Sequence, residues 1–168
     1  MRLIMAKKKK SDAGGTPATV ALTRSKINFS LHPYEHHDDA ESFGDEAAEQ
    51  LGIDPHRIFK TLVADVSGRL VVAVVPVAGR LDLKALAQAV GSKKATMADP
   101  QQAARSSGYV VGGISPIGQR TKLATVVDAS AHDHPTVFVS AGRRGLQVEL
   151  AAADLIMITD AVTAAIAG

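Results

Sequence analysis

The run Leu70-Val71-Val72-Ala73-Val74-Val75 constrains the fold of this 168-residue chain more than any other feature of its sequence. Side chains alternate between the two faces of a strand, and this run is apolar on both. It therefore predicts a strand inside a sheet that is covered on each side. A second apolar run, Phe59 to Asp65, precedes it, and Ser67-Gly68 stands between the two. That spacing predicts a β-hairpin.

Lys60 lies inside the first arm of this hairpin. In a strand it shares a face with Ile58 and Leu62, while Phe59 and Thr61 point to the other face, so neither side offers a polar surface. An ammonium in such a place reaches water, pairs with an anion, or loses its proton more easily than a solvated lysine does. Reaching water is typical of a lysine on an edge strand, whereas the other two outcomes are properties of binding and catalytic sites. Lys60 is therefore the first candidate for a functional residue.

The composition indicates a globular domain with a basic tail. The length corresponds to about one domain, and 46% hydrophobic with 21% charged residues is ordinary for a globular protein. The chain has no cysteine, which excludes disulfides, thiolate metal sites and a protein thiol nucleophile and fits a cytoplasmic protein. We expect residues 1–15, which include Lys7 to Lys10, to form a flexible tail that either only increases solubility or is weakly attracted to RNA phosphates. Residues 16–168 are expected to form a single domain, with no membrane span.

The remaining elements are short. Helices are predicted after the N-cap signals Thr16-Pro17, Asp82 and Asp99-Pro100, over Asp45 to Leu51, and over the Ala/Ile-rich stretch Ala152 to Ala167. Further strands are predicted at 30–35, 93–97, 124–128, 136–139 and 146–150. Short strands and helices without a regular alternation predict an α/β (α+β) fold. We expect a mixed, mostly antiparallel β-barrel or strongly curved sheet flanked by short helices.

Several motifs of known chemistry are missing or incomplete. The glycine-rich loop at 108–118 does not match the dinucleotide fingerprint, and no phosphate-binding loop is present, so no nucleotide cofactor is expected. Ser115 precedes a proline and lacks the nucleophile-elbow pattern, which disfavours a serine nucleophile. A cluster of possible metal ligands has spacings that fit no defined site: His32, His36, His37, Asp38 and Asp39. We expect this cluster to be a solvated loop, and we expect neither a metal nor a cofactor.

Five segments occur here in the order that a known family shows. They are Lys60-Thr61-Leu62, Pro76-Val77-Ala78-Gly79-Arg80-Leu81-Asp82-Leu83-Lys84, Met97-Ala98-Asp99-Pro100, the loop from Gly108 to Pro116, and Arg144-Gly145-Leu146. In these segments the chain resembles the YbaK/EbsC proteins, which are Cys-tRNA(Pro) deacylases related to the editing domain inserted in bacterial prolyl-tRNA synthetases. The resemblance extends from about residue 17 to about residue 158. Several motifs in the right order are far more specific than any one of them.

The resemblance implies an enzyme that cleaves the ester between a wrong amino acid and tRNA, on a mixed β-barrel flanked by helices. Lys60 matches a lysine that is essential in the family, so it is the predicted catalytic residue. The predicted substrate-binding residues match the family's pocket and its glycine-rich wall: Tyr34, Phe43, Gly44, Thr61, Gly112, Gly113, Ile114, Ser115, Pro116, Gly118, Ser140, Gly142 and Gln147. The chain departs from the family at Ala141, where glycine is common, and at Gln147, where aspartate is common. Gln147 can act only as a neutral hydrogen-bonding group.

An aminoacyl ester is already activated, so a site needs mainly to position it and to stabilise an oxyanion. Lys60 or N–H groups of the glycine loop can supply that stabilisation. For a cysteinyl ester the resemblance implies attack by the substrate's own thiolate, a step that fits either a hydrolase or a lyase. It also implies the acceptor end of aminoacyl-tRNA as substrate and prolyl-tRNA synthetase as partner, with no DNA bound. Two alternatives stay open: a deacylase for mischarged Ala or Ser, and a non-catalytic module that binds tRNA or a synthetase.

Overall fold

The computed structural model describes residues 15–37 and 43–168, and for Phe43 only its place in the backbone. The helices are α2 (Pro17–Arg24), α3 (Phe43–Leu51), α4 (Leu83–Ala89), α5 (Pro100–Ser107) and α6 (Ala152–Ile158), with a 3-10 helix η1 (Ala129–Asp133). The strands are β1 (Phe29–Pro33), β2 (Phe59–Val66), β3 (Arg69–Pro76), β4 (Ala95–Met97), β5 (Ala124–Asp128), β6 (Thr136–Arg143), β7 (Leu146–Ala151) and β8 (Val162–Ala164). The basic run Lys7 to Lys10 lies outside the described residues. None of the helices described is long and apolar enough to cross a membrane.

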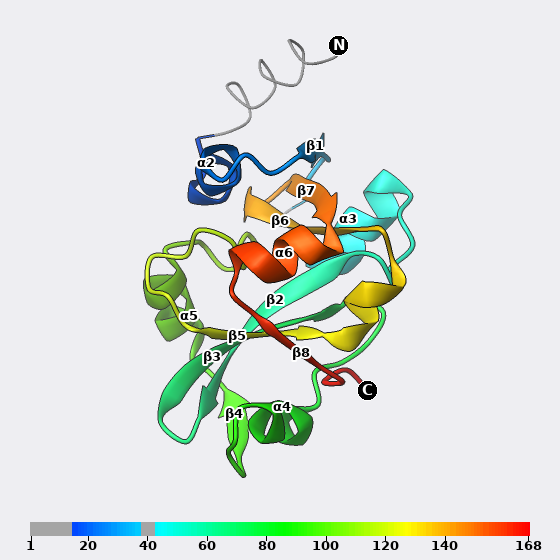
Figure 1. Ribbon diagram of the computed structural model, residues 1–168. Helices are drawn as coiled ribbons and strands as arrows, with labels where there is room; N and C mark the ends of the chain where they lie inside the picture. Colours follow the sequence, from blue (N-terminus) through cyan, green and yellow to red (C-terminus); the bar gives the residue numbers. More distant parts are fainter. Residues whose placement is uncertain (1–14, 38–42) are drawn as a thin grey trace.

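The strands form two sheets (Figure 1). One has five strands in the order β4-β2-β3-β5-β8, and the other has three in the order β1-β7-β6. The pairings β1–β7, β6–β7, β2–β3 and β2–β4 are antiparallel, whereas β3–β5 and β5–β8 are parallel. In Figure 1 the three-stranded sheet lies with α2 at one end of the molecule, and α4 and β4 lie at the other. The predicted hairpin is confirmed as β2 and β3.

A β-bridge joins the two sheets. Ile58, just before β2, pairs in parallel with Phe138 of β6. Beyond this bridge β2 pairs with β4, beginning at Ala64 and Met97, so the contact with β6 does not extend into a ladder. Among the residues described, each sheet therefore keeps two edge strands and no barrel closes. Of the two predicted alternatives, a β-barrel or a strongly curved sheet, the barrel is not confirmed, while the mixed and mostly antiparallel arrangement is.

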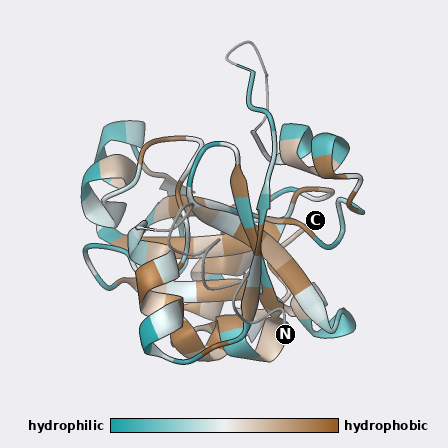
Figure 2. Cartoon of the chain, turned by 90° about the horizontal axis from the view of Figure 1, so that it is seen from above, coloured by the Kyte–Doolittle hydropathy of each residue, from teal (hydrophilic) through white to brown (hydrophobic). Residues whose placement is uncertain are grey.

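Both faces of β3, the second strand of the hairpin, are buried, as its apolar sequence predicts. Val72 and Val74 belong to a core that also contains residues of α2 and of the three-stranded sheet. Val71, Ala73 and Val75 belong to a second core with α4 and the C-terminal segment. In Figure 2 the hydrophobic colour is concentrated on the strands in the middle of the molecule. The cavity described below lies against β2, which pairs along its whole length with this buried strand.

Two helix starts show the predicted capping contacts. Thr16 Oγ1 accepts the N–H of Thr19 at 3.2 Å, and Asp82 Oδ1 accepts the N–H of Ala85 at 3.0 Å. These contacts satisfy N–H groups that a helix leaves unpaired in its first turn. Asp99 precedes α5 as predicted, but its side chain makes no capping hydrogen bond.

The helix predicted from Ala152 to Ala167 is wrong beyond Ile158. There α6 ends, the chain turns through Asp160 with a φ of 53°, and β8 pairs in parallel with β5. Asp128 Oδ1 accepts the N–H groups of Ile166 at 2.9 Å and Ala167 at 3.0 Å, and the Ile166 side chain is fully buried. Helix propensity is a weak preference, and these long-range contacts override it.

Candidate active site

A cavity of about 400 Å³ lies against β2, between it, the segment from β4 to α5, and the loop after α5. Its lining residues are Tyr34, Gly44, Ile58, Phe59, Lys60, Thr61, Leu62, Val63, Met97, Ala98, Pro100, Ala103, Val111, Gly112, Ile114, Ser140 and Gln147. The walls are mainly apolar, and only a few side chains bring polar groups. An apolar pocket with a small number of placed polar groups is the usual form of a small-molecule site.

Lys60 brings the positive charge to this lining. It is half-buried and stands opposite Val75 in the β2–β3 ladder. Within the described ranges its Nζ has no hydrogen-bond or ion-pair partner. No carboxylate or imidazole from those ranges lines the cavity either. The ammonium is thus available to an electron-rich group of a ligand.

Two buried polar atoms in the lining lack a partner among the residues that the structure describes. They are the hydroxyl of Thr61 and the side-chain carbonyl Oε1 of Gln147. Gln147 is only 6% exposed. Buried polar atoms in folded proteins are nearly always hydrogen-bonded, and exceptions often mark places where a ligand binds. Ser140 Oγ accepts the N–H of Gly142 at 3.1 Å, which leaves its own hydroxyl hydrogen to donate.

Tyr34 adds a phenol to the wall. It follows β1, and its N–H donates to the carbonyl of Gly145 at 2.9 Å. Burial raises the pKa of the Tyr34 hydroxyl above its ordinary value, and hydrogen bonding with the Gly145 backbone and the Gln147 side chain opposes the rise. Because the net shift is upward, Tyr34 is a neutral phenol at physiological pH and can donate a hydrogen bond.

The structure brings eight of the predicted site residues together in the cavity lining: Tyr34, Gly44, Lys60, Thr61, Gly112, Ile114, Ser140 and Gln147. Five others are not part of the lining: Gly113, Ser115, Pro116, Gly118 and Gly142. The side chain of Phe43 lies outside the described residues. The eight residues come from four segments that are distant in the sequence: 34–44, 60–61, 112–114 and 140–147.

The predicted glycines outside the lining serve close packing. A Cβ on Gly113 would approach Arg143 Cα at 2.9 Å, and one on Gly118 would approach the carbonyl oxygen of Pro17 at 2.6 Å. Gly142 has a φ of +107°, and a Cβ there would meet the Tyr109 ring at 2.8 Å. At these three positions the absence of a side chain allows the backbone to pack closely against its neighbours.

The glycine loop is fixed by side chains at both of its ends. Tyr109 Oη donates to the carbonyl of Ile117 at 2.6 Å, and Ser115 Oγ accepts the N–H of Ile117 at 3.2 Å. The Arg144 guanidinium donates to the carbonyl of Val111 from Nε at 2.9 Å and from Nη2 at 2.7 Å. Ser115 is fully buried, so its role here is to cap a turn. The loop is thus a preorganised wall of the cavity.

Nine residues that line the cavity were not predicted from the sequence to belong to the site: Ile58, Phe59, Leu62, Val63, Met97, Ala98, Pro100, Ala103 and Val111. Met97, Ala98 and Pro100 stand in a segment that carries the family resemblance, which was the available signal. The apolar residues of the strand pattern are predicted to be core, and nothing in the sequence distinguishes four of them from other core positions: Ile58, Phe59, Leu62 and Val63.

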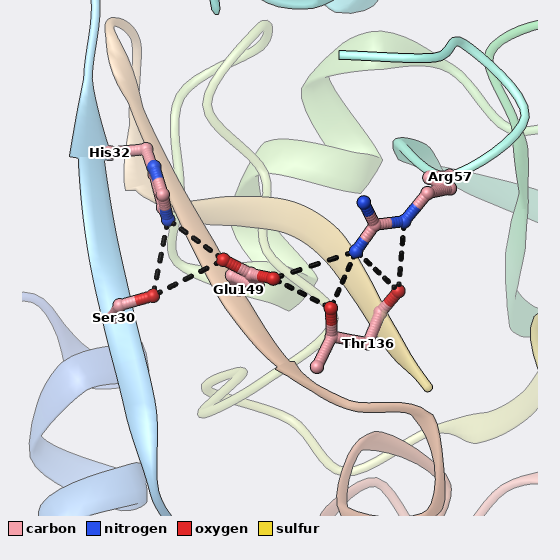
Figure 3. A network of polar contacts seen from close by, with 5 residues as sticks. All are labelled: Ser30, His32, Arg57, Thr136 and Glu149. Atoms are coloured by element: carbon pink, nitrogen blue, oxygen red, sulfur yellow. Dashed lines mark hydrogen bonds and ion pairs between the residues drawn. The ribbon is translucent and has the colours of Figure 1, made fainter. Parts of the chain in front are cut away.

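A polar network lies next to the cavity, on the same face of β7 as Gln147 (Figure 3). Glu149 is its centre: it accepts from Thr136 Oγ1 at 2.6 Å, contacts His32 Nε2 at 3.0 Å, and accepts from Arg57 Nη2 at 3.5 Å. His32 stands opposite Gln147 in the β1–β7 register. Burial alone would raise the pKa of Glu149, but Thr136, His32 and Arg57 together bring it below its ordinary value. The network ties β1, β6 and β7 together beside Gln147.

The histidines of the sequence cluster separate in the structure. His32 contacts Glu149 at 3.0 Å, His36 contacts Glu46 at 2.9 Å, and His37 lies 3.7 Å from Glu35. In the described part of the chain no three acidic or histidine side chains converge as metal ligands. Asp38 and Asp39 lie outside that part.

The family profile of the aminoacyl-tRNA editing domain matches residues 37–158. A protein of Enterococcus faecalis, EbsC, is 39% identical over 161 residues, which cover 93% of this chain and 94% of that protein. EbsC is named, provisionally, as a Cys-tRNA(Pro)/Cys-tRNA(Cys) deacylase. The chain belongs to the aminoacyl-tRNA editing domain family. It is accordingly an enzyme of the aminoacyl-tRNA deacylase class.

Solved structures share the fold of this editing domain. A crystal structure described, provisionally, as a trans-editing enzyme for prolyl-tRNA synthetase has a TM-score of 0.80 at 24% identity, covering 90% of this chain and 95% of the other. A protein used as a scaffold for computational grafting of linear epitopes has a TM-score of 0.79 at 25% identity, with the same coverage. These likenesses support the two-sheet arrangement as the fold of the family.

Proposed function

We propose that the editing domain is a free-standing, trans-acting deacylase that clears Cys-tRNA(Pro) in the cytoplasm. The observation that carries this proposal is the cavity lining. The lining presents one ammonium, that of Lys60, together with unpaired acceptor and donor groups. None of the described residues contributes an imidazole, a carboxylate or a thiol to it. Such a site can hold an activated ester, and it has no acid–base dyad to generate a nucleophile. The relationship to EbsC supports a cysteinyl ester as the substrate.

The missing nucleophile is the substrate's own thiol. Its sulfur attacks the ester carbonyl and forms a C–S bond, the C–O bond to the terminal ribose breaks, and the thiol proton ends on the ribose oxygen. The products are tRNA with a restored hydroxyl and a four-membered thiolactone, which water then opens to cysteine. A thiolate is a far better nucleophile at neutral pH than a serine hydroxyl, so the thiol also provides the selectivity.

The residues of the lining have distinct roles in this proposal. Lys60 places its ammonium beside the oxygen that gains negative charge, which lowers the barrier most effectively in a site with apolar walls. Gln147 Oε1 accepts a hydrogen bond from the substrate's amino group without adding a negative charge. The loop residues Gly112 and Ile114 form the wall that receives the terminal ribose. No cofactor is required for any of these roles.

Selection of the tRNA is proposed to come from a partner. Arg143 and Arg144 are exposed next to the glycine loop, where they can contact phosphates of the acceptor end without reading sequence. We therefore expect the isolated domain to discriminate poorly between cysteinylated tRNA(Pro) and tRNA(Cys). Prolyl-tRNA synthetase is the partner that would select tRNA(Pro). Strong discrimination by the domain alone would contradict this division of labour.

The direct test is deacylation of tRNA(Pro) charged with Cys, Ser, Ala or Pro by the purified full chain. The proposal expects rapid release of cysteine, weak action on serine, and alanine and proline esters left at their spontaneous rates. Equal rates on the Cys and Ser esters would exclude the substrate-thiol mechanism. Preference for Ala would instead assign the enzyme to alanine editing. Binding of all four without cleavage would identify a tRNA-binding module.

A further inference from the structure

One edge of β2 is only partly paired, and the unpaired part faces the cavity. On the β3 side, the N–H of Val77 donates to the carbonyl of Ile58 at 2.9 Å, and the register places Lys60 opposite Val75. In an antiparallel ladder, hydrogen-bonded pairs alternate with non-bonded pairs. Ile58 and Lys60 are therefore in bonded pairs with β3. Thr61, one residue further, directs its N–H and C=O to the opposite edge.

On that opposite edge of β2, backbone groups before and after Thr61 are hydrogen-bonded, but those of Thr61 are not. At one end the N–H of Phe138 donates to the carbonyl of Arg57 at 3.0 Å, and at the other the N–H of Ala98 donates to the carbonyl of Val63 at 3.0 Å. Pairing with β4 covers only Ala64 to Val66. From the part of the chain that is described, no group pairs with the backbone N–H or C=O of Thr61. Thr61 lines the cavity instead.

We propose that the aminoacyl group of the substrate binds as a one-residue β-strand against Thr61. The Thr61 N–H donates to the ester carbonyl, and the Thr61 C=O accepts from the α-ammonium group. An amino acid in an extended conformation presents both of its groups on one side, as a residue in a bonded antiparallel pair does. This inference rests on the proposed function, since it takes an aminoacyl ester as the ligand.

The length of the gap favours a single residue over a peptide. The Ile58–Phe138 bridge closes one end, and the hydrogen bond between Val63 and Ala98 closes the other. A longer strand would collide with β6 or β4. The Thr61 N–H also points at the oxygen that becomes negative when the carbonyl is attacked, so it acts as an oxyanion donor that needs no reorganisation.

The pairing also determines where the amino-acid side chain lies. Directly opposite residues of an antiparallel pair project their side chains to the same face, with Cα atoms about 5.5 Å apart in a bonded pair. The side chain of an L-aminoacyl group therefore lies beside that of Thr61, whose buried Oγ1 lacks a partner among the described residues. A thiol or hydroxyl can hydrogen-bond to it. The D-enantiomer would project its side chain to the face of Lys60.

The test uses three esters of the same tRNA(Pro), charged by an aminoacylating ribozyme: L-cysteine, D-cysteine and 3-mercaptopropionate, which lacks the amino group. All three carry the attacking thiol. After subtraction of spontaneous hydrolysis, we expect the L-ester to be cleaved about a hundredfold or more faster than either analogue. Cleavage of all three at the rate of the L-ester overturns the strand pairing and leaves the deacylase function intact. Failure to cleave the L-ester as well overturns the proposed function.

Variants at Thr61 give a second measurement. Thr61→Pro removes the N–H, and proline is tolerated in a strand where the N–H has no ladder partner. Thr61→Ala keeps the N–H and removes the hydroxyl, so it is the matched control. We expect cleavage of the L-ester to fall about a hundredfold in a folded Thr61→Pro protein and about tenfold in Thr61→Ala. A folded Thr61→Pro protein that cleaves the L-ester at the rate of Thr61→Ala would contradict the role of the N–H. If Thr61→Pro does not fold, the comparison of the three esters tests the strand pairing by itself.

Discussion

Ser140 and Gln147 stand directly opposite each other in the β6–β7 ladder, and both line the cavity that contains Lys60. This relationship fixes the polar wall of the site, because the register of a β-ladder leaves the two side chains on one face. Lys60 comes from the other sheet, which meets β6 at the Ile58–Phe138 bridge. The site is therefore assembled where the two sheets join.

Gln147→Leu tests the neutral acceptor in the wall. The change removes a buried carbonyl that lacks a protein partner within the described residues, but also the side-chain hydrogen bond with Tyr34, so we expect only a small net change in thermal stability. Loss of the bond to the substrate ammonium should lower kcat/KM for Cys-tRNA(Pro) by about tenfold or more. The control is Gln88→Leu at an exposed position on α4, which should leave the rate unchanged. An unaltered rate for Gln147→Leu would remove this residue from the site.

Glu149→Gln tests the polar network beside Gln147 by the pH dependence of stability. The folded-state pKa of Glu149 is below its ordinary value. Its stabilising contribution is therefore complete above the unfolded pKa, near 4.3, and is lost as the pH falls through the folded pKa. Glu149→Gln should melt at a lower temperature at pH 7, and its melting temperature should decline less between about pH 5 and pH 3 than that of the wild type. Glu49→Gln, at an exposed position on α3, should keep the wild-type slope.

Gly113→Ala tests the packing of the glycine loop. The added Cβ would lie 2.9 Å from Arg143 Cα, which is main-chain and cannot rotate away. We expect a loss of about 1–3 kcal/mol in the free energy of unfolding, with reduced activity as the loop shifts. Gly79→Ala is the matched control, since its Cβ would meet the nearest side chain at an ordinary 3.5 Å. Equal melting temperatures for the two variants would show that the loop accommodates the methyl group.

Much of the site could be predicted because its signals are local. The alternation around Lys60 is a property of a few consecutive residues, and so are the hairpin turn at Ser67-Gly68 and the caps at Thr16 and Asp82. The family resemblance then pointed to residues of four segments, and these residues line one pocket. These signals do not depend on knowing which strands become neighbours.

The rest depends on pairing between distant segments. The cavity at Thr61 exists because β4 stops pairing with β2 at Ala64, a limit set by a strand about thirty residues further along the chain. The C-terminal strand β8 forms against β5 although its sequence favours a helix, because Asp128 binds the N–H groups beyond it. Whether a barrel closes also depends on pairing between distant segments, because it requires β2 and β6 to pair over more than the single bridge between Ile58 and Phe138.

The most direct test of the account is the deacylation rate of Lys60→Ala on Cys-tRNA(Pro), measured with the melting temperature of the same preparation. Lys84→Ala, at an exposed position on α4, is the matched control. We predict that Lys60→Ala lowers the rate by about two powers of ten or more. Its melting temperature should be unchanged or higher, because the change removes a half-buried charge from an apolar strand. A folded Lys60→Ala protein that cleaves Cys-tRNA(Pro) at the rate of Lys84→Ala would contradict the assignment of Lys60 as the catalytic residue.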